Sequence, residues 1–141
     1  MVDKQFILMG SPGTGKSCIL ALICIYIAVV YDRPVVWFRQ VGGGWGSQIT
    51  TRLFYQGKYY KWEDSEGENY ENLYEYLKVV DNVKTCWSCL TGMPQCQIVK
   101  KRWFNRFRML ATSGQFTVKS EGAEFTEFAL YRTGGRRIWK V

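Results

Sequence analysis

Eight residues near the N-terminus have the types and spacing needed to bind a phosphate group. The segment from Gly10 to Ser17 follows the pattern Gly-x4-Gly-Lys-Ser/Thr in full. Glycine lets the main chain approach an anion closely, Lys16 supplies charge to the outer phosphates, and Ser17 supplies a hydroxyl ligand for Mg²⁺. The pattern predicts binding of a nucleoside triphosphate, ATP or GTP, with Mg²⁺. The candidate binding residues are Gly10, Ser11, Pro12, Gly13, Thr14, Gly15, Lys16, Ser17 and Cys18.

Such a loop works only between a strand and a helix, and the sequence on either side predicts both. Gln5 to Met9 is a short apolar run that ends at glycine, which is typical of a buried strand in a parallel sheet. Lys16 to Val30 is almost wholly apolar and lacks internal glycine and proline, which predicts a buried helix. Backbone N–H groups at the start of that helix, together with its dipole, would favour a bound phosphate.

The rest of the chain continues the alternation of strands and helices. We expect strands at 34–38, 85–90, 108–113 and 125–131, helices at 69–79 and 95–107, and an inserted β-hairpin at about 48–63. In the 95–107 helix, Ile98, Val99 and Trp103 are expected to face inward. The alternation predicts an α/β fold, with a mainly parallel sheet, flanking helices and right-handed crossovers. Residues 1–141 are expected to form a single domain.

The loop resembles the Walker A loop of P-loop NTPases, and Gly-Ser-Pro-Gly-Thr-Gly-Lys-Ser is close to its AAA-type version. Phe6 to Ile27, Pro34 to Trp37 and Cys86 to Gly92 together resemble the NTPase region of oomycete Crinkler effectors and the related retrotransposon hot spot proteins. The resemblance covers roughly residues 5 to 115. It implies a P-loop NTPase-like fold and a location inside a host cell. A chain of 141 residues lacks room for the lid or effector domain of such relatives, which suggests a reduced or truncated NTPase.

A P-loop enzyme usually has an aspartate at the end of a second strand, which steadies the Mg²⁺. In this chain the matching strand runs into Thr91-Gly92, so Thr91 occupies the Walker B position without a carboxylate. Asp81 is the rival carboxylate, but it would precede the strand, whereas ligands bind beyond the carboxyl ends of strands. No histidine is present to act as a base. We therefore expect hydrolysis to be weak or absent.

Two further positions could contact the triphosphate. By resemblance to AAA-like folds, Ser113 at the end of the 108–113 strand is a candidate sensor of the γ-phosphate, and a surface-loop serine is the alternative. A transition-state arginine could come from the C-terminal segment, because arginine stabilises developing phosphoryl charge. The alternative interpretation of that segment is a solvated basic tail. Its arginines are Arg132, Arg136 and Arg137.

Five cysteines, an odd number, favour reduced thiols in an intracellular protein of the cytoplasm or nucleus. Cys86-x2-Cys89 could indicate a redox pair or a zinc site. A redox pair opens a helix, whereas this pair lies in a predicted strand, where positions three apart face opposite ways. Structural zinc needs four ligands, and this motif supplies only two of them. We therefore expect both thiols to pack in the core.

The net charge of +7 is unevenly distributed and suggests anionic partners. Residues 1–62 carry +5, residues 63–81 carry −6 and residues 82–141 carry +8. The basic cluster from Lys100 to Arg108 could bind nucleic acid, or it could be a solvated face. A degenerate interaction module without nucleotide is the other alternative. The longest apolar run, Cys18 to Tyr31, is too short to span a membrane, and no signal peptide is visible.

Overall fold

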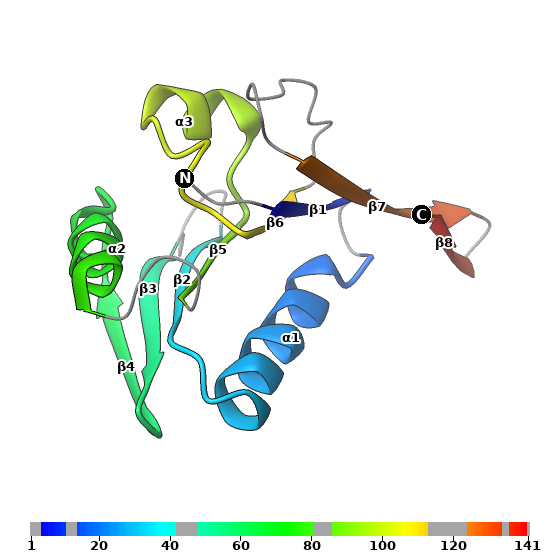
Figure 1. Ribbon diagram of the computed structural model, residues 1–141. Helices are drawn as coiled ribbons and strands as arrows, with labels where there is room; N and C mark the ends of the chain where they lie inside the picture. Colours follow the sequence, from blue (N-terminus) through cyan, green and yellow to red (C-terminus); the bar gives the residue numbers. More distant parts are fainter. Residues whose placement is uncertain are drawn as a thin grey trace.

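A computed structural model describes residues 4–10, 14–41, 48–80, 86–112, 124–133 and 136–140. The fold is mixed α/β, with three helices and one mixed sheet in these residues (Figure 1). The elements in chain order are β1 (Lys4–Gly10), α1 (Lys16–Val30), β2 (Val35–Val41), β3 (Gln48–Tyr55), β4 (Lys58–Glu63), α2 (Glu68–Val80), β5 (Trp87–Thr91), α3 (Gln95–Lys100), β6 (Met109–Thr112), β7 (Glu124–Thr133) and β8 (Arg136–Lys140).

Strands β1 to β6 form a mixed sheet, which β7 and β8 extend on the β1 side in the order β4-β3-β2-β5-β6-β1-β7-β8. The five central strands, from β2 to β7 in this order, are parallel. The strands β3, β4 and β8 are antiparallel to their inner neighbours. Because the five central strands run the same way, all their carboxyl ends lie at one edge, here called the carboxyl edge. This is the edge at which β1 leads into α1.

The helices lie on both faces of the sheet (Figure 1). Helix α1 lies on one face, called the α1 face, and α2 and α3 lie on the other, called the α2 face. The chain crosses from β1 to the distant β2 by way of α1 and then returns through β5 and β6. Crossovers of the same hand that travel in opposite directions place their helices on opposite faces, which accounts for this arrangement.

Each face has its own apolar core, because alternate strand residues point to opposite faces. On the α1 face, Leu20 and Cys24 of α1 pack against Val35, Trp37 and Cys89. On the α2 face, the buried aromatic cluster of Phe38, Tyr70 and Trp103 joins β2, α2 and the segment after α3. A central sheet buried on both sides is what the apolar strands predict.

The predicted hairpin insertion is confirmed. Strands β3 and β4 pair antiparallel around Gln56-Gly57, with Thr51 opposite Trp62 and Tyr55 opposite Lys58. Gln56 and Gly57 have φ angles of 51° and 72°. Two successive positive φ angles are the requirement of a type I′ turn, whose twist matches that of the flanking strands.

The predicted helix at 95–107 is too long, because α3 ends at Lys100. Arg102 takes the left-handed conformation with a φ of 59°. The Arg102 N–H donates to the Val99 carbonyl, and the Trp103 N–H donates to the Ile98 carbonyl, which together form a Schellman motif. Ile98 and Trp103 are buried as expected, whereas Val99 is 49% exposed, so its inward assignment is wrong.

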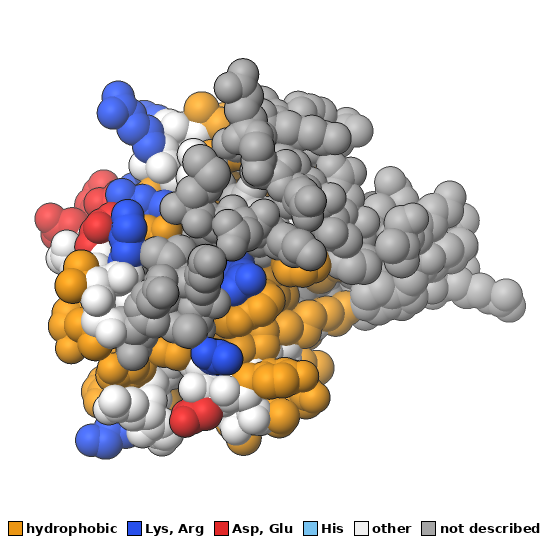
Figure 2. All heavy atoms as spheres, viewed as in Figure 1, with side chains coloured by type: hydrophobic (Ala, Val, Ile, Leu, Met, Phe, Trp, Pro, Cys, Tyr) orange, Lys and Arg blue, Asp and Glu red, His pale blue; other side chains and the backbone are white. Residues whose placement is uncertain are grey.

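The predicted helix after the loop is correct in its bounds but is not buried on all sides. Only Lys16, Leu20, Cys24 and Ile27 of α1 are buried. Large apolar side chains cover its outer surface, and Figure 2 shows hydrophobic side chains gathered where Figure 1 places α1. The exposed ones are Leu22, Ile23, Ile25, Tyr26, Val29, Val30 and Tyr31. This segment lacks apolar periodicity, so its residues do not indicate an exposed side.

The C-terminal segment forms a strand pair. The predicted strand at 125–131 is confirmed within β7, and β8 pairs antiparallel with it. Arg132 lies opposite Arg137 in this ladder. The backbone of Arg136 and Arg137 thus belongs to a strand, β8, and is not an irregular tail.

Candidate phosphate-binding site

The candidate loop begins at the end of β1 and ends at the start of α1, as the sequence predicts. Gly15 precedes the helix in a left-handed conformation with a φ of 87°, which favours glycine over other residues. The Gly15 carbonyl accepts a hydrogen bond of 3.0 Å from the Ile19 N–H, which closes the first turn of α1. Three loop residues, Ser11, Pro12 and Gly13, lie outside the described residues. The described part thus places helix N–H groups at the carboxyl edge.

Lys16 lies at the first position of α1 and is buried. Its Nζ donates a hydrogen bond of 3.2 Å to Thr14 Oγ1, which is also buried. Burial lowers the pKa of the Lys16 ammonium, because removal from water disfavours its charged form. An anion beside this ammonium would offset that cost. Ser17 and Cys18, the next two residues, are exposed at the same helix end.

Strand β6 ends beside the loop. The register places Thr112, the last residue of β6, next to Met9 of β1. From β1 the chain moves across the sheet in one direction, and from β2 through β5 and β6 it moves back. Such a change of direction in an open α/β sheet is where ligands bind, outside the carboxyl ends of the strands. Ser113, the candidate sensor, directly follows Thr112 and lies outside the described residues.

Thr91 is the last residue of β5 and reaches the same edge, which confirms its predicted place in the fold. Its side chain is buried on the α1 face, where Thr91 Oγ1 accepts a hydrogen bond of 3.0 Å from Trp37 Nε1. One lone pair of the hydroxyl is therefore committed to the indole. Asp81, the rival carboxylate, lies outside the described residues.

Among the described residues, Ser17 and Thr91 bring no carboxylate to a Mg²⁺ ion at this edge. Mg²⁺ is bound through one or two carboxylates together with substrate phosphates. Both hydroxyls are neutral, and one lone pair of the Thr91 hydroxyl is committed to Trp37. Within the described ranges, no three Asp, Glu, Cys or His side chains gather as a metal site. We derive no step of a reaction through a metal at this position.

Two arginines that sequence reasoning missed lie on the α1 face beside Thr91. Arg39 of β2 is the direct partner of Thr91 in the parallel ladder, and Arg52 of β3 is the partner of Trp37. The guanidinium carbons of Arg39 and Arg52 lie 5.9 Å and 4.8 Å from the centroid of the Trp37 ring. Alternation along the 34–38 strand could have revealed Arg39, because Trp37 and Arg39 must share a face. The predicted strand ended at Phe38, three residues before the observed end of β2 at Val41.

The two cysteines of the Cys86-x2-Cys89 motif are thiols outside any disulfide and are buried, as expected for core packing. They belong to the cores of opposite faces, Cys86 to the α2 face and Cys89 to the α1 face. A hydrogen bond with Cys24, together with burial, raises the pKa of the Cys89 thiol well above its ordinary value. A raised pKa keeps the thiol protonated, which opposes a role as a nucleophile.

The basic cluster from Lys100 to Arg108 is divided among separate contacts. Lys101 donates to the Glu66 carbonyl at 2.6 Å, and Arg106 pairs with Glu75 at 3.5 Å. The guanidinium of Arg108 lies 4.4 Å from the centroid of the Trp87 ring. Because Trp87 packs on the α1 face and Glu75 belongs to α2, these cations do not share one surface.

Neither models of known protein families nor curated protein sequences match this chain. In the part of the chain that the structure describes, no helix is both long enough and apolar enough to cross a membrane.

Proposed function

We propose that this chain binds a nucleoside triphosphate, ATP or GTP, through the loop between β1 and α1, and that hydrolysis is weak or absent. The observation that carries the proposal is the buried Lys16 at the start of α1, directly after left-handed Gly15. A buried ammonium at a helix N-terminus creates a strong preference for an anion. The full Gly-x4-Gly-Lys-Ser pattern supports a polyphosphate as that anion.

We also propose that the fold is P-loop NTPase-like. The parallel order β2-β5-β6-β1-β7, with the loop following an inner strand, supports this assignment. Thr91 at the end of β5 supports weak hydrolysis, because it brings no charge to a metal or to an attacking water. Ser113 stays a predicted sensor of the γ-phosphate.

Titration of a fluorescent ATP analogue against Lys16→Ala tests the proposal. We expect affinity to fall at least about 100-fold, because a charge-assisted contact to phosphate is lost. Lys58→Ala is the matched control, since Lys58 is an exposed lysine that begins β4. Equal affinity of Lys16→Ala and the parent would show that the loop is not the site.

Thermal unfolding gives a second readout that needs no labelled ligand. A ligand at a hundred times its Kd adds about 2.7 kcal/mol to the free energy of unfolding. For a domain of this size, that corresponds to a rise in Tm on the order of 5–10 °C. The rise should occur with unlabelled ATP or GTP and should be absent in Lys16→Ala.

The exposed apolar side of α1 favours a second candidate, an interaction module that self-associates without nucleotide. No charged side chain lies between Ser17 and Tyr31, so two copies could bring these helices together without repulsion. Concentration-dependent dimerisation, lost in Val29→Lys, together with an unchanged Tm in ATP, would favour this candidate over nucleotide binding. Val29 is 74% exposed, so the substitution leaves the core intact.

A further inference from the structure

The hydroxyl of Thr14 lies against the lysine on which the proposed function depends. Thr14 Oγ1 accepts a hydrogen bond of 3.2 Å from Lys16 Nζ, and both residues are buried. We infer that Thr14 is a positioning residue, and that its hydroxyl holds the Lys16 ammonium in place before the triphosphate binds. This inference rests on the proposed function, because it concerns how the same site prepares its cation.

The turn into α1 brings the two side chains together. Gly15 lies between Thr14 and Lys16 and has a left-handed φ of 87°, which turns the chain sharply. The Gly15 carbonyl accepts from the Ile19 N–H at 3.0 Å, and Lys16 is the first residue of α1. The contact between Thr14 and Lys16 is therefore built on the first turn of the helix.

A lysine that is already in place binds an anion at a lower cost in entropy. The flexible stem of lysine loses rotamer freedom when its ammonium is fixed. With Thr14 as a partner, this loss occurs during folding rather than during binding, which favours affinity. The bond to Thr14 uses one of the three N–H groups of the ammonium, so it need not break when a phosphate oxygen binds another.

The Thr14 hydroxyl also favours the charged form of Lys16. Burial lowers the pKa of the Lys16 ammonium, because removal from water disfavours its charge. A hydroxyl oxygen that accepts a hydrogen bond from the ammonium stabilises the charged form and opposes this effect. Charge-assisted hydrogen bonds to phosphate require that form. The same hydroxyl thus supports both the position and the charge of the cation.

Titration of the fluorescent ATP analogue against Thr14→Val and Thr14→Ser tests the inference on the full chain. Valine keeps the β-branched shape and removes the hydroxyl, whereas serine keeps the hydroxyl. We expect Thr14→Val to raise the Kd at least about fivefold and Thr14→Ser to stay within about twofold of the parent, because only valine removes the hydrogen bond to the charged group. Thr50→Val is the matched control, since Thr50 is also buried but belongs to β3, which β2, β5 and β6 separate from β1.

A double-mutant cycle with Lys16→Ala separates an action through Lys16 from a direct contact with the ligand. If the hydroxyl acts through Lys16, adding Thr14→Val to Lys16→Ala should change the Kd by less than about twofold, since coupled residues are not additive. A direct contact with phosphate, or a general role in the shape of the loop, would give the full loss in both backgrounds. The analogue is titrated to millimolar concentration, so that weak binding in the Lys16→Ala background is measured.

The outcomes separate this inference from the proposed function. An unchanged Kd for Thr14→Val, equal losses in Thr14→Val and Thr14→Ser, or a full additional loss in the Lys16→Ala background overturns the positioning role and leaves nucleotide binding intact. Equal affinity of Lys16→Ala and the parent, or no binding by the parent, overturns both. The melting temperature of each variant without ligand shows whether a lost affinity comes from unfolding. If Thr14→Val does not fold, Thr14→Ala also lacks the hydroxyl and carries the same expected result.

Discussion

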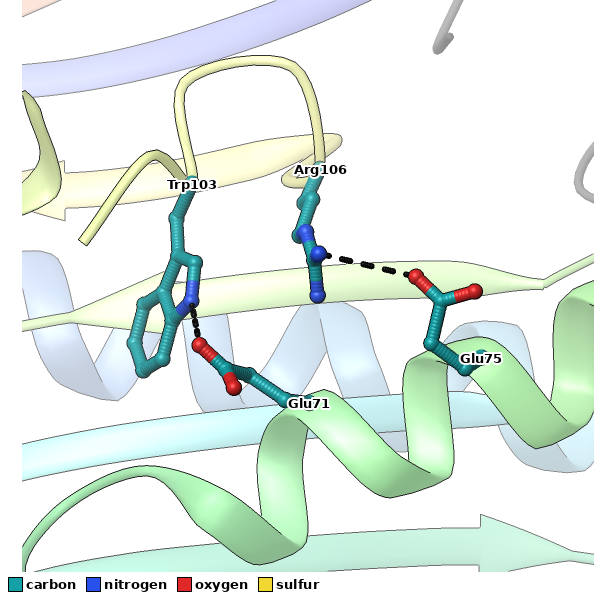
Figure 3. A network of polar contacts seen from close by, with 4 residues as sticks. All are labelled: Glu71, Glu75, Trp103 and Arg106. Atoms are coloured by element: carbon teal, nitrogen blue, oxygen red, sulfur yellow. Dashed lines mark hydrogen bonds and ion pairs between the residues drawn. The ribbon is translucent and has the colours of Figure 1, made fainter.

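The two faces of the sheet differ in whether their charged side chains have partners of opposite charge. On the α2 face, acidic side chains meet donors from elsewhere in the fold, and Figure 3 shows Glu71 and Glu75 of α2 directed at Trp103 and Arg106. Trp103 Nε1 donates to Glu71 at 2.8 Å, and Arg106 pairs with Glu75 at 3.5 Å. On the α1 face, the guanidiniums of Arg39 and Arg52 rest on an indole, and no ion pair joins either to a described carboxylate.

The difference separates charged groups that have protein partners from charged groups that have none among the described side chains. Removing one partner of a buried polar pair leaves the other unsatisfied, so matched buried groups are costly to delete. Removing a cation that lacks an ion-pair partner costs folding little. Mutation of charged residues should therefore lower stability more on the α2 face than at the carboxyl edge of the α1 face.

The largest expected effect is that of Asp64→Ala on the α2 face. The buried Asp64 carboxylate accepts hydrogen bonds from Thr51 Oγ1 at 2.7 Å, from the Tyr70 N–H at 2.9 Å and from the Asn69 N–H at 3.1 Å. It thereby satisfies N–H groups in the first turn of α2 and complements the helix dipole. We expect a loss of about 3 kcal/mol in the free energy of unfolding, measured by urea titration.

Arg39→Gln supplies the contrast in the same assay. We expect its free energy of unfolding to stay within about 0.5 kcal/mol of the parent, since the guanidinium has no ion-pair partner to orphan. If Arg39→Gln destabilised the protein as much as Asp64→Ala, the contrast between the two faces would be refuted.

Gly67→Ala should rank second. Gly67 has a φ of 80°, and an added Cβ would collide with the buried ring of Trp103, which anchors the α2 face. We expect a loss of about 2–3 kcal/mol, from backbone strain and from displacement of the indole.

Gly57→Ala separates these two causes. Gly57 has a φ of 72°, but no atom lies within 4 Å of its added Cβ. It should lose only about 1 kcal/mol, the cost of a left-handed φ alone. Equal losses in the free energy of unfolding at the two glycines would mean that the collision with Trp103 does not contribute to the loss.

A pH dependence should come from Tyr70, which belongs to the aromatic cluster of the α2 face. Burial raises the pKa of the Tyr70 phenol, whose hydroxyl is hydrogen-bonded to Ser88 Oγ. The unfolded chain ionises this phenol near pH 10, whereas the folded protein keeps it neutral. Its contribution to stability is therefore complete below pH 10 and is lost as the pH rises further.

Urea midpoints at pH 8 and pH 11 measure this dependence. Tyr70→Phe should cost about 1 kcal/mol at pH 8 and should lose less stability than the parent between the two pH values. Tyr76→Phe is the control, because Tyr76 is 57% exposed on the same helix, and it should keep the dependence of the parent. An identical loss in Tyr70→Phe and the parent would remove Tyr70 as the source.

The local elements could largely be predicted from the sequence. Helix α2 follows from apolar spacing, and the β3–β4 hairpin follows from two β-rich runs around Gln56-Gly57. The end of α3 could not, because an arginine rather than a glycine adopts the left-handed cap at Arg102. Burial of Trp103 among the α2-face aromatics accompanies that conformation. The helix propensity of the local residues does not include the stability gained by burying a side chain against distant parts of the chain.

By itself, the sequence determined the loop pattern from Gly10 to Ser17, the strand and helix on either side of it, and the strand that ends near Thr91. These features depend on neighbouring residues and on the periodicity of apolar side chains. Only the tertiary structure decided that Arg39 lies beside Thr91, that Arg52 joins it over Trp37, and that one side of α1 is exposed. Strand order and register bring together residues that lie 52 positions apart in the chain, from Arg39 to Thr91. Such pairings depend on packing summed over the whole sheet, which no single segment encodes.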